Sequence, residues 1–111
     1  LVSGTKLPAS RFDARGEVFA LGSAAFAPGQ AKPSTEGSAS LAALAAYLQA
    51  TPKAKARIEG YGDAQTPGQR RADAVRDALV AAGVPKVRMQ TAAGKGNGSR
   101  QRAVEVIVVQ P

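Results

Sequence analysis

Two side chains of opposite charge flank a predicted strand–helix junction, and their types define the chemistry that this sequence offers. Asp63 follows the Gly-Tyr-Gly that ends an apolar segment, and Arg71 lies near the start of the next predicted helix. A carboxylate and a guanidinium brought together by the turn can pair with each other. They can also bind a zwitterion, the Asp taking an ammonium and the Arg a carboxylate in bidentate fashion. The positive end of the helix dipole favours the same anion.

The residue types that most catalytic and metal sites need are absent. The sequence contains no His and no Cys, which excludes Cys-based zinc sites, disulfides, thiol nucleophiles and His-dependent triads. Glu59 precedes Asp63 by four residues, which suggests paired acids for acid–base work, but no nucleophile accompanies them. Residues 94–98 lack the Gly-Lys-Ser/Thr ending of a phosphate loop. We therefore predict that the chain is not an enzyme and uses no cofactor or metal.

The two elements that position Asp63 and Arg71 are predicted from periodicity and from end signals. Residues 55–62 alternate loosely between polar and apolar side chains and are predicted to form a strand. The segment Thr-Pro-Gly-Gln that follows fits a capping box with Thr66 as the N-cap, so a helix is predicted over residues 67–82 with a stop at Gly83. One face of this helix is apolar: Ala72, Val75, Leu79 and Ala82.

A second helix is predicted earlier in the chain, over residues 40–52. Ser38 or Ser40 would cap its start, and Pro52 cannot continue it. Its apolar residues recur at the spacing of one helix face: Leu41, Leu44, Ala45 and Leu48.

Three further strands complete the fold prediction, over residues 16–23, 84–93 and 102–110. Loops rich in Gly, Pro and Ser separate the elements at residues 27–38 and 94–99. The order β-α-β-α-β-β predicts an α+β fold, in which two main helices pack on one face of a mixed four-stranded sheet. The last two strands either pair with each other or only lie near each other.

The length of the chain limits the number of domains, and its net charge indicates the kind of partner. The chain has 111 residues, enough for one domain, which we place at residues 15–111 after a linker or flexible arm at residues 1–14. The formal charge of +7 favours anionic partners. Because aromatic residues make up only 5% of the chain and no known motif is present, nucleic-acid binding is not expected. No stretch is long and apolar enough to cross a bilayer, so membrane association would come only through flanking regions.

Several segments, in order, resemble the OmpA-like peptidoglycan-binding domain of Gram-negative envelope proteins, over about residues 15–110. Val18-Phe19 lies in the first strand, and Phe26 follows at the family spacing. The segment Glu59-Gly60-Tyr61-Gly62-Asp63 stands where the family has Glu-Gly-His-Thr-Asp. The later matches are Arg71-Ala72 with Val75 and Leu79, Gly83-Val84 with Arg88, and Gln101-Arg102-Ala103-Val104-Glu105-Val106 in place of Asn-Arg-Arg-Val-Glu-Ile.

The resemblance implies a non-catalytic module that anchors a protein to the cell wall. In that family the Asp and the helix Arg hold diaminopimelate of the peptidoglycan stem peptide. Asp63 would therefore take its ammonium and Arg71 its carboxylate, with Arg102 in the same pocket and Tyr61 and Gly62 as possible lining residues. The implied location is the periplasm, in the cell envelope near the outer membrane, with other envelope proteins as possible further partners.

Departures from the family pattern keep an alternative function open. Tyr61 replaces the family His, Gly62 replaces the Thr, and the turn between Asp63 and Arg71 is several residues shorter. A trimmed turn changes the position of Arg71 relative to Asp63. The alternative is a degenerate OmpA-like domain that serves as a protein-interaction or structural module of an envelope or secretion assembly, without binding peptidoglycan.

Overall fold

The computed structural model describes residues 7–8, 10–27, 30–62, 66–97 and 102–109. Strands and helices follow in the order β1 (Ser10–Asp13), β2 (Gly16–Leu21), α1 (Thr35–Ala50), β3 (Lys55–Gly62), α2 (Gly68–Ala81), β4 (Met89–Asn97) and β5 (Val104–Val109). Two short 3₁₀ turns, η1 (Ser23–Ala25) and η2 (Lys86–Arg88), precede α1 and β4. Among the described residues, no helix is long and apolar enough to cross a membrane.

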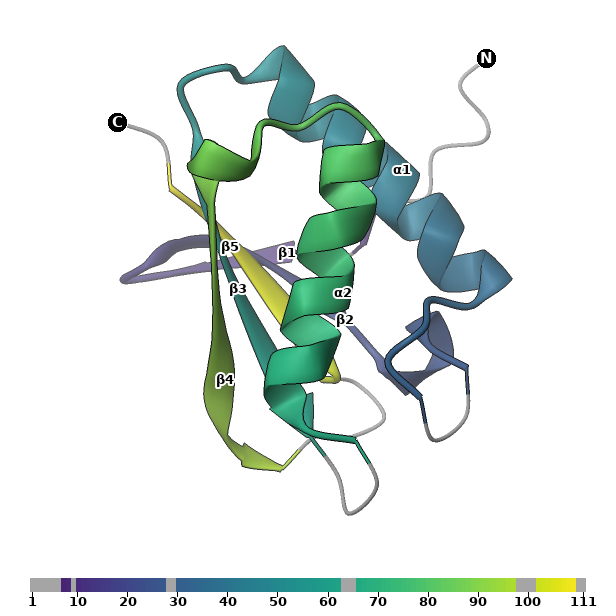
Figure 1. Cartoon of the computed structure of the whole chain (residues 1–111). Helices are drawn as coiled ribbons and strands as arrows, with labels where there is room; N and C mark the ends of the chain where they lie inside the picture. The colour runs from purple at the N-terminus through teal and green to yellow at the C-terminus, as the bar shows by residue number, and fades with distance from the viewer. Residues whose placement is uncertain (1–6, 9, 28–29, 63–65, 98–101, 110–111) are drawn as a thin grey trace.

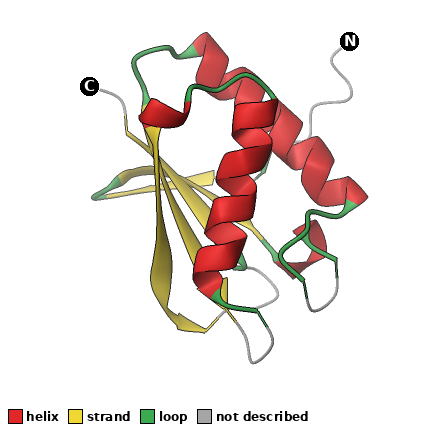
Figure 2. Cartoon of the chain, in the orientation of Figure 1, coloured by secondary structure: helices red, strands yellow, loops and turns green. Residues whose placement is uncertain are grey.

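The strands form one mixed sheet in the order β1-β2-β5-β3-β4, in which only β3 and β4 run parallel. Figures 1 and 2 show both helices on the same face of this sheet. The predicted α+β class, the mixed sheet and the packing of the helices are therefore confirmed. The last two strands of the chain do not neighbour each other in the sheet, because β3 lies between them.

The prediction of four strands was wrong, because the sheet has five. The additional strand is β1, which lies within the stretch expected to be a linker or flexible arm and pairs antiparallel with β2. All four of its residues are exposed. An exposed edge strand lacks the apolar alternation from which strands are predicted, and main-chain pairing alone defines it.

Helix α1 begins at Thr35, five residues before the predicted start. Ser34, rather than Ser38 or Ser40, is the N-cap, and its hydroxyl accepts a hydrogen bond of 3.1 Å from the amide of Gly37. The predicted apolar face is confirmed, because its members are all buried: Leu41, Leu44, Ala45 and Leu48. The first turn, Thr-Glu-Gly-Ser, contains no apolar residue, so sequence analysis places it in the loop predicted at residues 27–38.

Helix α2, in contrast, begins one residue later than predicted, at Gly68, with Pro67 at the N-cap position instead of Thr66. The expected capping box is therefore displaced, and a close contact between Gly68 and β3 fixes the start of the helix, as described below. Gly83 has a φ of 109°, which fits its predicted role as the helix stop. Of the four residues predicted for the apolar face, Ala72, Val75 and Leu79 are fully buried. The fourth, Ala82, is exposed.

Strand β4 runs from Met89 to Asn97, later than the predicted strand at residues 84–93. The turn η2 occupies part of the predicted segment, and the glycine-rich residues 94–97 continue β4 instead of forming a turn. The hydrophobic core lies between the sheet and the helices. Its largest fully buried members include Phe19, Leu44, Leu48, Ile58, Leu79, Val104 and Val106.

Candidate functional site

The end of β3 and the start of α2 meet through main-chain contacts that only glycine permits. A Cβ on Gly60 would lie 1.9 Å from the carbonyl oxygen of Gly68, and a Cβ on Gly68 would lie 2.3 Å from the carbonyl oxygen of Gly60. A Cβ on Gly62 would lie 2.6 Å from the carbonyl oxygen of Thr66. We call this junction, formed by residues 60–62 and 66–71, the β3–α2 mouth. Its three glycines let the helix start sit directly against the strand.

Arg71 lies in the first turn of α2 and is held inside this mouth, with only 6% of its surface exposed. Its Nη1 donates a hydrogen bond of 2.7 Å to the carbonyl oxygen of Tyr61. Its guanidinium carbon lies 5.7 Å from the centre of the Phe26 ring. A carbonyl and an aromatic face both favour a cation, so the local fold orients the guanidinium as well as burying it.

The other predicted site residues surround the same strand end. Asp63 lies outside the described residues. Gly62 is the last residue of β3 and is half-buried. The guanidinium of Arg102 stacks on the ring of Tyr61, with its central carbon 4.1 Å from the ring centre. Tyr61 is thus contacted by two arginines: Arg71 at the carbonyl oxygen of Tyr61, and Arg102 at the ring of Tyr61.

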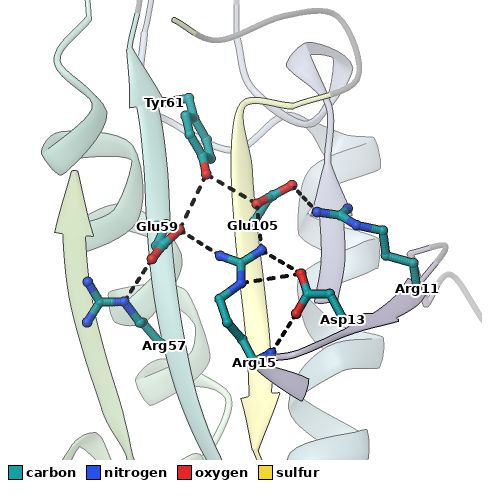
Figure 3. A network of polar contacts seen from close by, with 7 residues as sticks. All are labelled: Arg11, Asp13, Arg15, Arg57, Glu59, Tyr61 and Glu105. Atoms are coloured by element: carbon teal, nitrogen blue, oxygen red, sulfur yellow. Dashed lines mark hydrogen bonds and ion pairs between the residues drawn. The ribbon is translucent and has the colours of Figure 1, made fainter. Parts of the chain in front are cut away.

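The side chain of Tyr61 points toward the helix-free face of the sheet and enters a polar network there (Figure 3). Its hydroxyl lies 3.2 Å from Oε1 of Glu105 and 3.3 Å from Oε1 of Glu59, and shares its single proton between them. Arg11 and Arg15 approach Glu105 at 3.1 and 3.8 Å. The open-face network, as we call it, has seven members from three strands (β1, β3 and β5) and the turn between β1 and β2: Arg11, Asp13, Arg15, Arg57, Glu59, Tyr61 and Glu105.

The charges in this network shift the pKa of several members. A hydrogen bond of 2.8 Å from Arg57 lowers the pKa of Glu59, and the charge of Arg15 adds to this effect. Hydrogen bonds from Arg15 lower the pKa of Asp13. Burial raises the pKa of the Tyr61 hydroxyl, and the charge of Glu105 raises it further.

Sequence reasoning did not find the network, although one signal for it is present. The amide of Arg15 donates a hydrogen bond of 2.8 Å to Oδ1 of Asp13, as in an Asx-type turn, and Gly16 follows with a φ of 136°. The segment Asp-Ala-Arg-Gly at residues 13–16 is therefore a readable turn signal between β1 and β2. The contact between Arg11 and Glu105 joins residues 94 positions apart, which no local pattern shows.

The acidic side chains of the described residues form neither a metal site nor a catalytic acid pair. No group of three acidic residues among them could hold a metal ion. Glu59, considered above as half of an acid pair with Asp63, instead accepts hydrogen bonds from Arg57 and Arg15. Its carboxylate is engaged in holding the sheet surface together.

Comparison with known proteins identifies the family. The model of the OmpA family matches residues 25–106. No curated protein matches the chain. The periplasmic domain of Helicobacter pylori MotB (residues 97–256 of that protein) is similar in fold, with a TM-score of 0.76 and 15% identity over 92% of this chain and 86% of that chain.

Two further solved structures share the fold. The OmpA-like domain of FopA1 from Francisella tularensis aligns with a TM-score of 0.68 and 18% identity, over 98% of this chain and 90% of that one. The peptidoglycan-associated lipoprotein from Burkholderia pseudomallei aligns with a TM-score of 0.62 and 22% identity, over 80% of this chain and 91% of that one. The prediction that the chain is not an enzyme agrees with these relatives. Because the family model matches most of the length of the chain, the chain belongs to the OmpA family.

Proposed function

We propose that this domain is a non-catalytic cell-wall anchoring module that binds the diaminopimelate stem peptide of peptidoglycan. Membership of the OmpA family and the likeness to a peptidoglycan-associated lipoprotein support a peptidoglycan ligand. The observation that carries the finer proposal is the buried Arg71, oriented by the carbonyl of Tyr61 at the start of α2. By the same argument, the domain works in the periplasm, within the cell envelope and close to the outer membrane.

The proposed binding divides a zwitterion between two groups at the β3–α2 mouth. Arg71 takes the free carboxylate of diaminopimelate in bidentate fashion, and the start of α2 adds main-chain amides and a positive dipole for the same anion. Asp63, directly after the end of β3, takes the ammonium. Arg102, on the ring of Tyr61, adds a second positive charge near the strand end.

The test is an amide-shift titration of the labelled domain with the tripeptide L-Ala-γ-D-Glu-meso-diaminopimelate. We expect shifts at residues 60–63 and 69–72. Arg71→Lys keeps the charge but removes the bidentate geometry, so it should weaken binding at least tenfold, and Asp63→Asn should do the same. Arg70→Ala, a change at the exposed neighbour of Arg71, is the matched control and should bind like the parent.

A second ligand separates the proposed recognition from simple charge attraction. The same tripeptide with lysine in place of diaminopimelate lacks the second carboxylate and should bind at least tenfold more weakly. Equal binding of both peptides, or parent-like binding by a folded Arg71→Lys variant, would refute the assignment of Arg71.

One feature of the mouth favours the alternative, a structural or protein-interaction module without peptidoglycan binding. The strand and the helix start are in main-chain contact at Gly60 and Gly68, and Tyr61 already occupies one arm of the Arg71 guanidinium. If the titration is flat at millimolar tripeptide while the domain is folded, this alternative replaces the first proposal.

A further inference from the structure

A groove of about 470 Å³ lies at the end of the sheet where β3 begins. Figure 1 shows η2, the start of β4 and the end of β5 at this end, and the start of α2 at the other end. The groove extends along β3 to Arg57, which lies three residues, or about 10 Å at roughly 3.3 Å per residue, before Gly60 of the β3–α2 mouth. Its lining includes Lys53, Lys55, Arg57, Val87, Arg88 and Val109.

The charged side chains that line the groove are all positive. Four cations line it, and none of the described residues in its lining is acidic. Arg57 is balanced by Glu59 at 2.8 Å. Among the residues that the structure describes, Arg88 donates only to the main-chain carbonyls of Leu48, Thr51 and Ala54, so no carboxylate there balances its positive charge.

The two lysines carry the rest of the excess charge. Both Lys53 and Lys55 are exposed, and neither makes an ion pair with any residue that the structure describes. The neighbouring open-face network matches three arginines with three carboxylates. An excess of positive charge beside a balanced network is an anion-attracting surface.

The groove also exposes aliphatic surface. Val87, on η2, is 89% exposed, and Val109, at the end of β5, is 47% exposed. Val109 lies directly opposite Lys55 in the pairing of β5 with β3, so an apolar side chain and a lysine stand side by side. A ligand that covers this surface needs both anionic and aliphatic groups.

We propose that this groove binds an extended, acidic segment of a partner protein that also carries aliphatic side chains. The acidic groups would pair with Lys53 and Lys55, and the aliphatic ones would cover Val87 and Val109. This proposal is independent of stem-peptide binding, because it concerns the opposite end of the sheet.

Other anionic ligands fit the groove less well. Single-stranded nucleic acids bind with their bases stacked on exposed aromatic side chains, and the described lining of the groove contains no aromatic residue. A phosphate polymer has no aliphatic group to cover the valines. A bilayer surface is flat on this scale and would touch the rim of the groove without filling it.

The probe is an acetylated octapeptide of alternating glutamate and valine, titrated into the labelled domain. We expect saturable shifts at residues 53–57, 87–90 and 109. The variant Lys53→Glu/Lys55→Glu should weaken binding at least tenfold, and Val87→Ser about threefold. The control Lys32→Glu/Arg70→Glu makes the same change in net charge elsewhere and should weaken binding less than threefold.

Four further probes complete the test: two peptides, inorganic polyphosphate and phosphatidylglycerol vesicles. Peptides of alternating glutamine and valine, or glutamate and serine, should each bind at least fivefold more weakly, because each lacks one of the two required groups. Absence of saturable binding by the acidic peptide overturns the proposal. So does an equal loss in the Lys32→Glu/Arg70→Glu control, or tighter binding of inorganic polyphosphate or phosphatidylglycerol vesicles at the same residues.

Discussion

The β3–α2 mouth and the open-face network meet at Tyr61, yet opposite kinds of contact build them. The mouth depends on main-chain atoms: three glycines in close approach and a carbonyl that receives Arg71. The network depends on charged side chains that come from distant parts of the chain. One residue serves both, through its carbonyl on one side and its hydroxyl on the other.

This difference predicts how each region responds to change. A main-chain contact has no room for an added atom, so the mouth is sensitive to a single methyl group but insensitive to pH. In the ion-pair network, Arg15, Glu59 and Glu105 each have more than one charged partner, so the loss of one contact weakens the network gradually, and protonation of its carboxylates weakens it throughout. The following predictions test these two responses, starting with the largest.

Gly60→Ala should cause the largest loss of stability. The added Cβ would lie 1.9 Å from the carbonyl oxygen of Gly68 and 2.8 Å from the amide nitrogen of Ala72, both of them main-chain atoms that cannot rotate away. We expect a loss of about 3 kcal/mol in the free energy of unfolding, measured by urea denaturation. Arg70→Ala, at an exposed position in the same helix, should change it by less than about 0.5 kcal/mol. A Gly60→Ala variant as stable as the parent would show that the strand and helix are not in contact.

Glu105→Gln should have the next largest effect, on the network alone. Glu105 is 4% exposed and contacts Arg11, Arg15 and Tyr61. Because both arginines are about half exposed, water compensates part of the loss, and we expect about 1–2 kcal/mol. Asp77→Asn, at a carboxylate that is 68% exposed, is the control and should cost less than about 0.5 kcal/mol. A shift of the Arg71 resonances in Glu105→Gln would contradict the separation of the two regions.

Tyr61→Phe tests that separation at the residue the two regions share. The variant keeps the ring beneath Arg102 and the carbonyl that receives Arg71, and loses only the hydroxyl between two carboxylates. We expect a loss of about 1 kcal/mol in stability, the typical value of one hydrogen bond. Stem-peptide affinity should stay within twofold of the parent value. A larger loss of affinity at full folding would mean that the network positions Arg71 through Tyr61.

The same contrast explains which parts of the structure could be predicted from sequence. The apolar face of α1 and the bounds of β3 follow from local periodicity, and the structure confirms both. The capping box at Thr66 fits the local pattern as well, but the contact of Gly68 with Gly60 displaced the helix start. That contact is tertiary, so no local signal contains it.

The site was partly predictable for the same reason. Arg71 was selected through the family pattern and through its place at a helix start, both visible in sequence, and its role in ligand binding stays a prediction. The partners of Glu105 were not found, because Arg11 lies 94 residues away in an exposed edge strand without apolar alternation. Charged networks on a sheet face leave little periodic signal, since their members are recognised only after the strands are placed in order.

The smallest predicted effect concerns pH, and its sign follows from the lowered pKa values of Glu59 and Asp13. As the pH falls, these carboxyls bind protons first in the unfolded chain, near their ordinary values of 4.5 and 3.8. The stability that they contribute is therefore complete above about pH 5.5 and declines as the pH falls through the lower folded values.

Arg57→Gln isolates the part of this decline that belongs to Glu59. Without the hydrogen bond from Arg57, the folded pKa of Glu59 should rise toward its ordinary value, so acidification should cost the variant less than the parent. Because Arg57 is 49% exposed, we expect a difference of about 0.5 kcal/mol between pH 6.5 and pH 3, measured by urea denaturation. Lys32→Gln removes a cation elsewhere and should follow the parent curve. If Arg57→Gln also follows it, Arg57 does not hold the charge of Glu59, and the network stabilises the sheet face through its uncharged contacts instead.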